Sequence, residues 1–232
     1  LNVLAFMPLT LWLWRAPYGP NFRDQELERG RPVKGFGDII ETVRAISGDR
    51  TIVSMILLSG AASFMVGSGH TSQLPEFSLA LGHADGLFYS LLFGANAAGA
   101  FCAGIVLESW NILTSRPRTS VILVCLWSLA IGAFALTRDY HVALTLLFIA
   151  GFLNLSYNSM AQALVQLNSP AAIRGRVIGL YAMARNGLTA FSGVTIGMVG
   201  GVIGIHTSLA LSAAILLVMA LSLMPMTKRV VT

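Results

Sequence analysis

The sequence predicts an all-α integral membrane protein, and three observations support this fold class. Apolar residues make up 55% of the 232 residues and charged residues only 11%, and the mean hydropathy is +0.73. These values lie outside the range of soluble globular domains. The apolar residues also gather in runs near the roughly 20 residues that a helix needs to cross a bilayer. The basic residues concentrate in alternate loops between these runs, as expected for a protein that spans the membrane several times.

The chain begins with Leu1 inside an apolar run that ends at Trp14. The run is too short to cross a bilayer, it has no basic flank before it, and no small-residue cleavage site follows it. We therefore expect residues 1–14 to be the end of a truncated transmembrane helix rather than a signal peptide.

Residues 15–50 form one long polar segment with seven basic residues and three prolines, which predicts a linker rather than a folded domain. Its second half alternates apolar and charged side chains at helical spacing, which predicts an amphipathic helix lying in the lipid headgroup region. A short solvated helix is the alternative. The apolar positions are Phe36, Ile39, Ile40, Val43 and Ile46, and the charged ones are Asp38, Glu41 and Arg44.

A six-helix transmembrane bundle is predicted over residues 51–226, followed by a tail at residues 227–232. Each of its apolar runs is near the length that crosses the hydrocarbon. The predicted spans are Thr51 to Gly69, Leu87 to Trp110, Ser120 to Thr137, Val142 to Val165, Val177 to Ile203 and Ser208 to Met226.

The loops between these spans differ in their content of lysine and arginine. The linker has seven such residues, the loops at 111–119 and 169–176 and the tail have two each, 138–141 has one, and 70–86 and 204–207 have none. Because basic loops stay cytoplasmic, we expect the linker and the C-terminus to be cytoplasmic. The absence of a soluble basic patch argues against nucleic acid as a partner.

Four of the six spans carry polar side chains in their interiors, and such residues are costly unless they face a bundle interior or an aqueous cavity. In the fourth span, amides repeat at every fourth residue and so form a stripe along one face. The third and sixth spans lack such residues, so we expect them to face lipid. The candidate cavity residues are Ser59, Ser63, Asn96, Asn154, Tyr157, Asn158, Gln162, Arg185 and Asn186.

Arg185 is the most expensive residue of this set, because a guanidinium near the bilayer centre costs at least about 2.5 kcal/mol on insertion scales. At about 1.5 Å of rise per residue, Arg185, Asn96 and Asn154 all fall near the midplane. We interpret Arg185 as functional; the alternative is that it braces packing or extends its head group toward the inner surface.

An enzyme is the competing class of function. Ser68 and His70 give a local Ser-Gly-His sequence, and His206 lies between later spans, which raises an intramembrane serine hydrolase as the alternative. A Ser-His dyad needs both groups at the same depth, whereas every histidine is predicted at the outer surface. The two cysteines and four histidines show no metal-ligand spacing, so no metal or other cofactor is expected. A six-helix scaffold that assembles with another chain is the third possibility.

The run from Asn168 to Tyr181 resembles a conserved loop of one protein family. It is similar to the P-x-x-x-R-G-R-V loop between helices ten and eleven of the major facilitator superfamily, in the branch of the enterobactin exporter and related transmembrane secretion effectors. A second match has the G-x-x-x-acid spacing of the cytoplasmic gating motif, with Ser109 where an arginine usually follows. By this resemblance the cytoplasmic gate residues are Gly104, Glu108, Arg116, Arg118, Pro170, Arg174, Gly175 and Arg176.

The resemblance implies the C-terminal six-helix bundle of a twelve-helix fold, preceded by the end of helix six. The six predicted spans become helices seven to twelve, of which seven, eight, ten and eleven line the cavity. The implied function is secondary transport by alternating access, with efflux of a drug or siderophore-like small molecule, in the bacterial inner membrane. The implied partners are protons as coupling ion, membrane lipid and a missing N-terminal six-helix half.

Overall fold

The structure is a computed structural model, and it describes residues 2–15, 36–82, 85–110 and 116–227. The chain divides into two units, Leu1–Lys34 and Gly35–Thr232. The first unit contains α1 (Asn2–Arg15), a helix over the N-terminal apolar run with Pro8 inside it.

Two parts of the predicted organisation lie outside the described residues. They are residues 16–35 of the linker, which hold most of its basic side chains, and residues 228–232 of the tail. Most of the described part of the linker is helical.

The amphipathic helix predicted before the bundle is present as α2 (Phe36–Ile46). Ile46 is buried, whereas Ile40 and Val43 are 62% and 46% exposed. The helix packs on α9 (Arg174–Ala182) in the second unit. Its apolar side therefore divides between the bundle and the surroundings, and its location among lipid headgroups stays a prediction.

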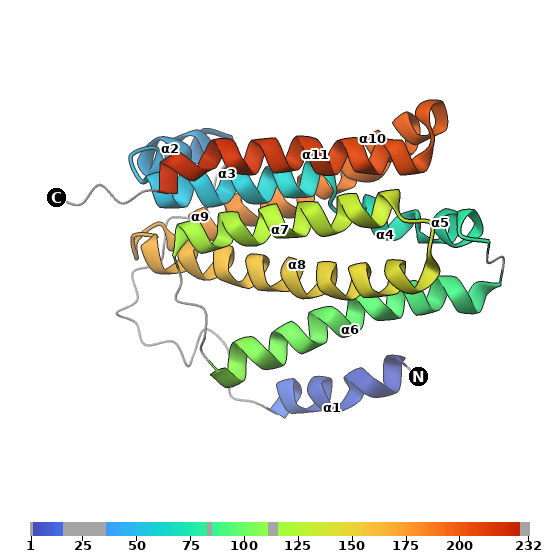
Figure 1. Cartoon of the computed structure of the whole chain (residues 1–232). Helices are drawn as coiled ribbons and strands as arrows, with labels where there is room; N and C mark the ends of the chain where they lie inside the picture. Colours follow the sequence, from blue (N-terminus) through green and yellow to red (C-terminus); the bar gives the residue numbers. More distant parts are fainter. Residues whose placement is uncertain (1, 16–35, 83–84, 111–115, 228–232) are drawn as a thin grey trace. The chain divides into compact units, whose positions relative to one another are not determined.

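Six helical segments are long and apolar enough to cross a membrane, which confirms the six predicted spans to within a few residues at each end. They are Arg50–Ser72, Gly86–Ser109, Pro117–Leu136, Tyr140–Asn168, Arg174–Ile203 and Ile205–Thr227. Figure 1 shows them running side by side as one bundle. The described part of the chain is helical throughout its regular elements, without strands.

The first two spans are joined by more structure than the sequence predicted. The first contains α3 (Arg50–Met65) and α4 (Gly69–Ser72), and α5 (Leu74–Ala80) leads toward α6 (Gly86–Trp110). Much of the predicted loop at 70–86 is therefore helical. Leu74 and Phe77 of this connection are buried, and they pack against the hydrophobic core of the bundle.

The remaining spans are α7 (Pro117–Leu136), α8 (Tyr140–Asn168), the fifth span and α11 (Ile205–Leu223), which ends in the short η3 (Met224–Thr227). The fifth span is one continuous helix made of α9, the π-helical η2 (Met183–Gly187) and α10 (Leu188–Ile203). Its π-helical turn is the main departure of this span from a regular α-helix.

Local chemistry explains where these helices begin. Asp49 accepts hydrogen bonds from the backbone N–H groups of Thr51 and Ile52, and Asp139 caps α8 in the same way. Both side chains satisfy donors that a helix N-terminus leaves unpaired. The bond from the Val142 N–H holds the pKa of Asp139 below its usual value.

The α7 helix corrects the expectation that the third span is peripheral. One of its faces is buried in the bundle through Val124, Trp127, Ile131 and Phe134. Its opposite face exposes Ile122, Leu126, Leu129 and Leu136. The helix packs on α3, α8 and α11, so the prediction was wrong for half of its circumference. Its inward face needs no polar groups because it fills the core.

Helices α6 and α8 cross at two glycines. A Cβ atom at Gly151 would lie 2.0 Å from the backbone oxygen of Asn96, and one at Gly99 would lie 1.9 Å from that of Phe148. Such close helix approach requires residues without a side chain. By contrast, a Cβ at Gly193 would meet nothing within 4 Å. The close-packed crossing is therefore on α6 and α8, away from the Gly193–Gly197 pair.

Candidate functional site

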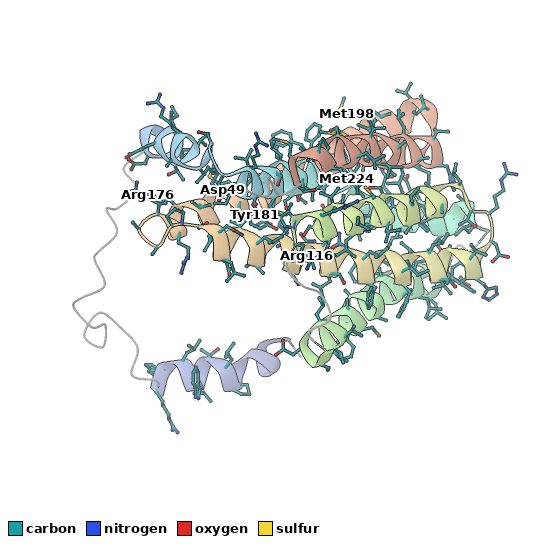
Figure 2. All side chains as sticks on the ribbon, turned by 60° about the vertical axis from the view of Figure 1, so that its left-hand side comes forward. Asp49, Arg116, Arg176, Tyr181, Met198 and Met224 are labelled. Atoms are coloured by element: carbon teal, nitrogen blue, oxygen red, sulfur yellow. The ribbon has the colours of Figure 1, made fainter. Side chains whose placement is uncertain are left out.

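A buried hydrogen bond joins α3 to α9 inside the bundle. The Ser59 hydroxyl donates to the Tyr181 hydroxyl at 3.2 Å, and the two residues are 0% and 3% exposed. Figure 2 shows Tyr181 among the packed side chains of the bundle, away from its end. Ser59 was a predicted cavity residue, whereas Tyr181 was not.

Tyr157 of α8 adds a second phenol to this place. It is 3% exposed and packs against the ring of Trp127, with 5.5 Å between ring centroids. Tyr181 and Arg185 lie within electrostatic range of its phenol, and Asn158 is the next residue on α8. The structure therefore brings together Ser59, Tyr157, Asn158, Tyr181 and Arg185, which we call the tyrosine cluster.

The side chains of the amide stripe predicted on α8 are only partly exposed. Asn158 is 6% exposed, and its Nδ2 donates to the backbone oxygen of Asn154 at 2.9 Å and to its Oδ1 at 3.2 Å. Asn154 is half-buried and Gln162 is exposed. The Asn158 Oδ1 is buried, and none of the described residues donates a hydrogen bond to it. One acceptor in the tyrosine cluster is thus unsatisfied.

Arg185 and Asn186 lie within the π-helical segment η2. Such segments are rare, and they often occur at functional sites. Arg185 is half-buried and acts electrostatically on Tyr157 and Tyr181, while Asn186 is exposed. The Thr189 hydroxyl donates to the Arg185 backbone oxygen at 2.6 Å. The extra residue per turn changes the direction in which the side chains of this segment point.

Two predicted cavity residues lie away from the tyrosine cluster. Asn96 is half-buried at the crossing of α6 with α8, where its backbone oxygen faces Gly151. Ser63 is buried one turn beyond Ser59, toward α4. Their places in a binding site stay predictions.

The loop before α9 positions the predicted gate residues. Pro170, Arg174 and Gly175 are exposed, and the Arg174 guanidinium donates to the Ser169 backbone oxygen from Nε and Nη2, at 3.4 Å each. A Cβ at Gly175 would meet nothing within 4 Å. Arg176 is half-buried and lies at the end of the bundle (Figure 2).

Two of the other predicted gate residues, Gly104 and Glu108, line an open hollow of about 560 Å³ at the C-terminal part of α6. Arg116 and Arg118 are exposed at the start of α7, and within the described residues no ion pair links Glu108 to either of them. The hollow is lined by Ala100, Phe101, Gly104, Ile105, Glu108, Ser109 and Leu155.

The histidines named for the hydrolase alternative both pack in the structure. His70 is 5% exposed, and it is near the end of the first span; its place at the outer side of the membrane stays a prediction. Its Nδ1 lies 3.0 Å from the Gly67 oxygen, and its ring meets the edge of Trp127. The Nδ1 of His206 lies 2.7 Å from the Ala135 oxygen. In the described residues, no group of three or more His, Cys, Asp or Glu side chains could hold a metal ion.

The Ser59–Tyr181 bond leads to a testable prediction. We expect Ser59→Ala and Tyr181→Phe each to lower the stability of the purified protein, and the double variant to lower it by less than the sum. The expected coupling energy is about 1 kcal/mol, as for a buried hydrogen bond between neutral groups. Denaturant unfolding of the four proteins of this cycle measures it. Additive effects would mean that the bond contributes nothing; Ser212→Ala, on α11, serves as a matched control.

Comparisons with known proteins agree with this architecture. The family model of the major facilitator superfamily matches residues 1–194. No curated protein sequence matches the chain. Among solved structures, a bacterial homolog of the human lysosomal transporter Spinster, in an inward-facing and unoccupied conformation, is similar in fold, with a TM-score of 0.56 and 15% sequence identity.

The matched region covers 94% of this chain and 55% of the Spinster homolog, so the chain spans about half of that protein's length. Six membrane-spanning helices in one bundle are the size of half a major facilitator fold. Because the family model matches well over half of the sequence, the chain belongs to the major facilitator superfamily.

Proposed function

We propose that the chain is the C-terminal half of a secondary active transporter that exports a small molecule by alternating access. The observation that carries this proposal is the tyrosine cluster, which places Arg185 on a π-helical segment beside two buried phenols. Superfamily transporters bind substrates near the midplane, between two rocking halves. Arg185, near the centre of the fifth span, is at this depth.

The exposed faces of two helices support the presence of a second half. In the spans formed by α6 and by α9 to α10, only 17% and 19% of an apolar stretch of 18 residues is buried within this chain. Large apolar side chains such as Phe101, Phe191 and Met198 are exposed on them. These helices correspond to two of the four that the sequence predicted to line a cavity. A second bundle would cover their open faces.

The distribution of charge supports the proposed orientation. Helices α3, α7 and α9 begin at one end of the bundle, and α5 lies toward the other end (Figure 1). Arg50 and Arg174 are the first residues of α3 and α9, and Arg116 directly precedes α7. Basic residues favour the cytoplasmic side. We therefore propose that the linker and C-terminus are cytoplasmic in a bacterial inner membrane, and that Pro170, Gly175 and Arg176 belong to the inner gate.

The proposed substrate is a drug or siderophore-like compound, as the resemblance of the loop from Asn168 to Tyr181 implies. No Asp or Glu lies near the middle of any span of this chain. If protons drive export, the group that carries them therefore belongs to the other half of the transporter.

Substitution of two cavity residues tests the proposal. We expect Asn154→Leu and Arg185→Leu in the full-length protein to leave membrane insertion intact, because both changes lower the cost of burial in lipid. Substrate efflux should fall at least tenfold in the Arg185 variant and less in the Asn154 variant. Accumulation assays in an efflux-deficient host measure this, with Leu129→Ala on the exposed face of α7 as control. Unchanged efflux in both variants would disprove the site assignment.

A further inference from the structure

We propose that the tyrosine cluster binds an anionic group of the transported solute, and that the solute carries a hydrogen-bond donor next to that group. This inference rests on the proposed transport function and names the class of substrate. It follows from three features of the cluster: an uncompensated cation, a phenol able to donate, and a buried acceptor without a donor.

The uncompensated cation is Arg185. It lies about 16 Å along the helix axis from Arg174, where the span begins, at 1.5 Å per residue. Among the described residues no carboxylate pairs with it, and the spans hold only one acidic side chain, Glu108, at the far end of α6. A cation at this depth needs a partner or water. Arg185 is only half-buried, so this chain leaves part of it uncovered.

The phenol is Tyr181. Its oxygen accepts the hydrogen bond from Ser59, which leaves its own O–H proton free to donate. Arg185 lies close enough to act electrostatically on both Tyr181 and Tyr157. A guanidinium and a phenol O–H are both donors, and donors of this kind form strong bonds to carboxylate or other oxyanions. A cationic solute would meet repulsion here and would find no carboxylate.

The acceptor is the Asn158 Oδ1. Asn158 is 6% exposed, its Nδ2 is held by Asn154, and no described residue donates to its Oδ1. A buried acceptor without a donor costs about 1–3 kcal/mol. The amide orientation is fixed, because turning it over would place Oδ1 against the Asn154 backbone oxygen. A hydroxyl or N–H of the solute, next to its anionic group, would supply the missing donor.

Two other surfaces of the chain give weaker grounds for proposing a ligand site. The hollow beside Glu108 is open and lined mainly by apolar side chains, and nothing in the structure indicates what would fill it. The exposed apolar side of α2 is small. The tyrosine cluster differs because two of its groups call for an anionic acceptor and a third calls for a hydrogen-bond donor.

The experiment uses the full-length protein in proteoliposomes and measures facilitated flux down a concentration gradient, so that no coupling ion is needed. The probes are mandelate, which has a carboxylate with a neighbouring hydroxyl, its neutral analogue mandelamide, and phenylacetate, which lacks the hydroxyl. We expect mandelate flux to exceed mandelamide flux at least tenfold. Arg185→Gln should abolish this preference, Arg185→Lys should retain part of it, and Arg138→Gln, in an exposed loop, should leave it unchanged.

The second arm tests the acceptor. We expect the wild-type protein to move mandelate at least threefold faster than phenylacetate, and Asn158→Leu to remove that difference. Gel filtration of each variant before reconstitution verifies that it is folded. Equal flux of mandelate and mandelamide in the wild type, or a preference that survives Arg185→Gln, would overturn the inference.

The same assay separates failure of this inference from failure of the proposed function. Flux of the neutral analogue mandelamide above that in protein-free vesicles is the reporter for transport as such. Mandelamide flux that equals or exceeds mandelate flux would overturn the anionic assignment while the proposed transport function is retained. If neither probe moves faster than in protein-free vesicles, the proposed function fails, and the inference fails with it.

Discussion

Gly151→Leu is expected to prevent α6 and α8 from packing, with a loss of stability above about 3 kcal/mol, at the upper end of the range for overpacked cores. Even the Cβ atom of the new side chain would lie 2.0 Å from the Asn96 backbone oxygen and 2.9 Å from its Oδ1. The neighbouring atoms are backbone, so no rotamer change can relieve the clash. The Gly99 contact with Phe148 prevents the helices from sliding to a new register.

Thermal unfolding in detergent, together with the yield of monodisperse protein, measures this effect. Gly94→Leu is the matched control, because Gly94 is on α6, the other helix of this crossing, and a Cβ there would meet nothing within 4 Å. We expect the control to unfold near the wild-type temperature. If the Gly151 variant were as stable as the Gly94 variant, the two helices would not need to approach so closely.

The same crossing shows what the sequence could and could not predict. Span lengths and their order followed from hydropathy, because a bilayer fixes the length of an apolar helix. The close-packed pair did not follow, since Gly99 and Gly151 are on different helices and no spacing within one helix relates them. The Gly193–Gly197 pair has the familiar small-residue spacing, yet a Cβ at Gly193 would meet nothing.

The sequence could predict several residues of the candidate site, but not how these residues are arranged in space. Ser59, Asn158 and Arg185 could be named from the sequence because polar side chains in a span are costly unless they face the bundle interior or an aqueous cavity. Tyr181 was missed, since a tyrosine near a span end more often anchors at the interface. The π-helical segment was also not predicted from the residues Met183–Gly187; in the structure it packs against α3.

Trp127 supports the candidate site from a helix that the sequence analysis assigned to the periphery. Its ring is 1% exposed and packs on both Tyr157 and His70. Polarity could not reveal this role, because a tryptophan in an apolar run looks the same whether it faces lipid or core. Its burial places one wall of the tyrosine cluster on α7.

Trp127→Ala is therefore expected to lower stability by about 3–5 kcal/mol, as for other fully buried aromatic residues. It should also lower substrate flux, because the cavity frees Tyr157 to rotate away from Arg185. Leu129→Ala, on the 55% exposed face of the same helix, should have little effect on either quantity. Denaturant unfolding and proteoliposome flux measure the two effects separately.

Trp127→Phe distinguishes ring packing from hydrogen bonding. The Trp127 Nε1 is buried, and no described residue accepts its proton, so phenylalanine removes an unsatisfied donor while it keeps most of the ring. Loss of such a donor offsets part of the cost of the smaller ring. We expect this variant to lose less than half of the stability that Trp127→Ala loses and to retain flux. An equal loss in both variants would mean that the indole N–H has a partner that matters, and that Trp127 acts through this group rather than by holding Tyr157 in place.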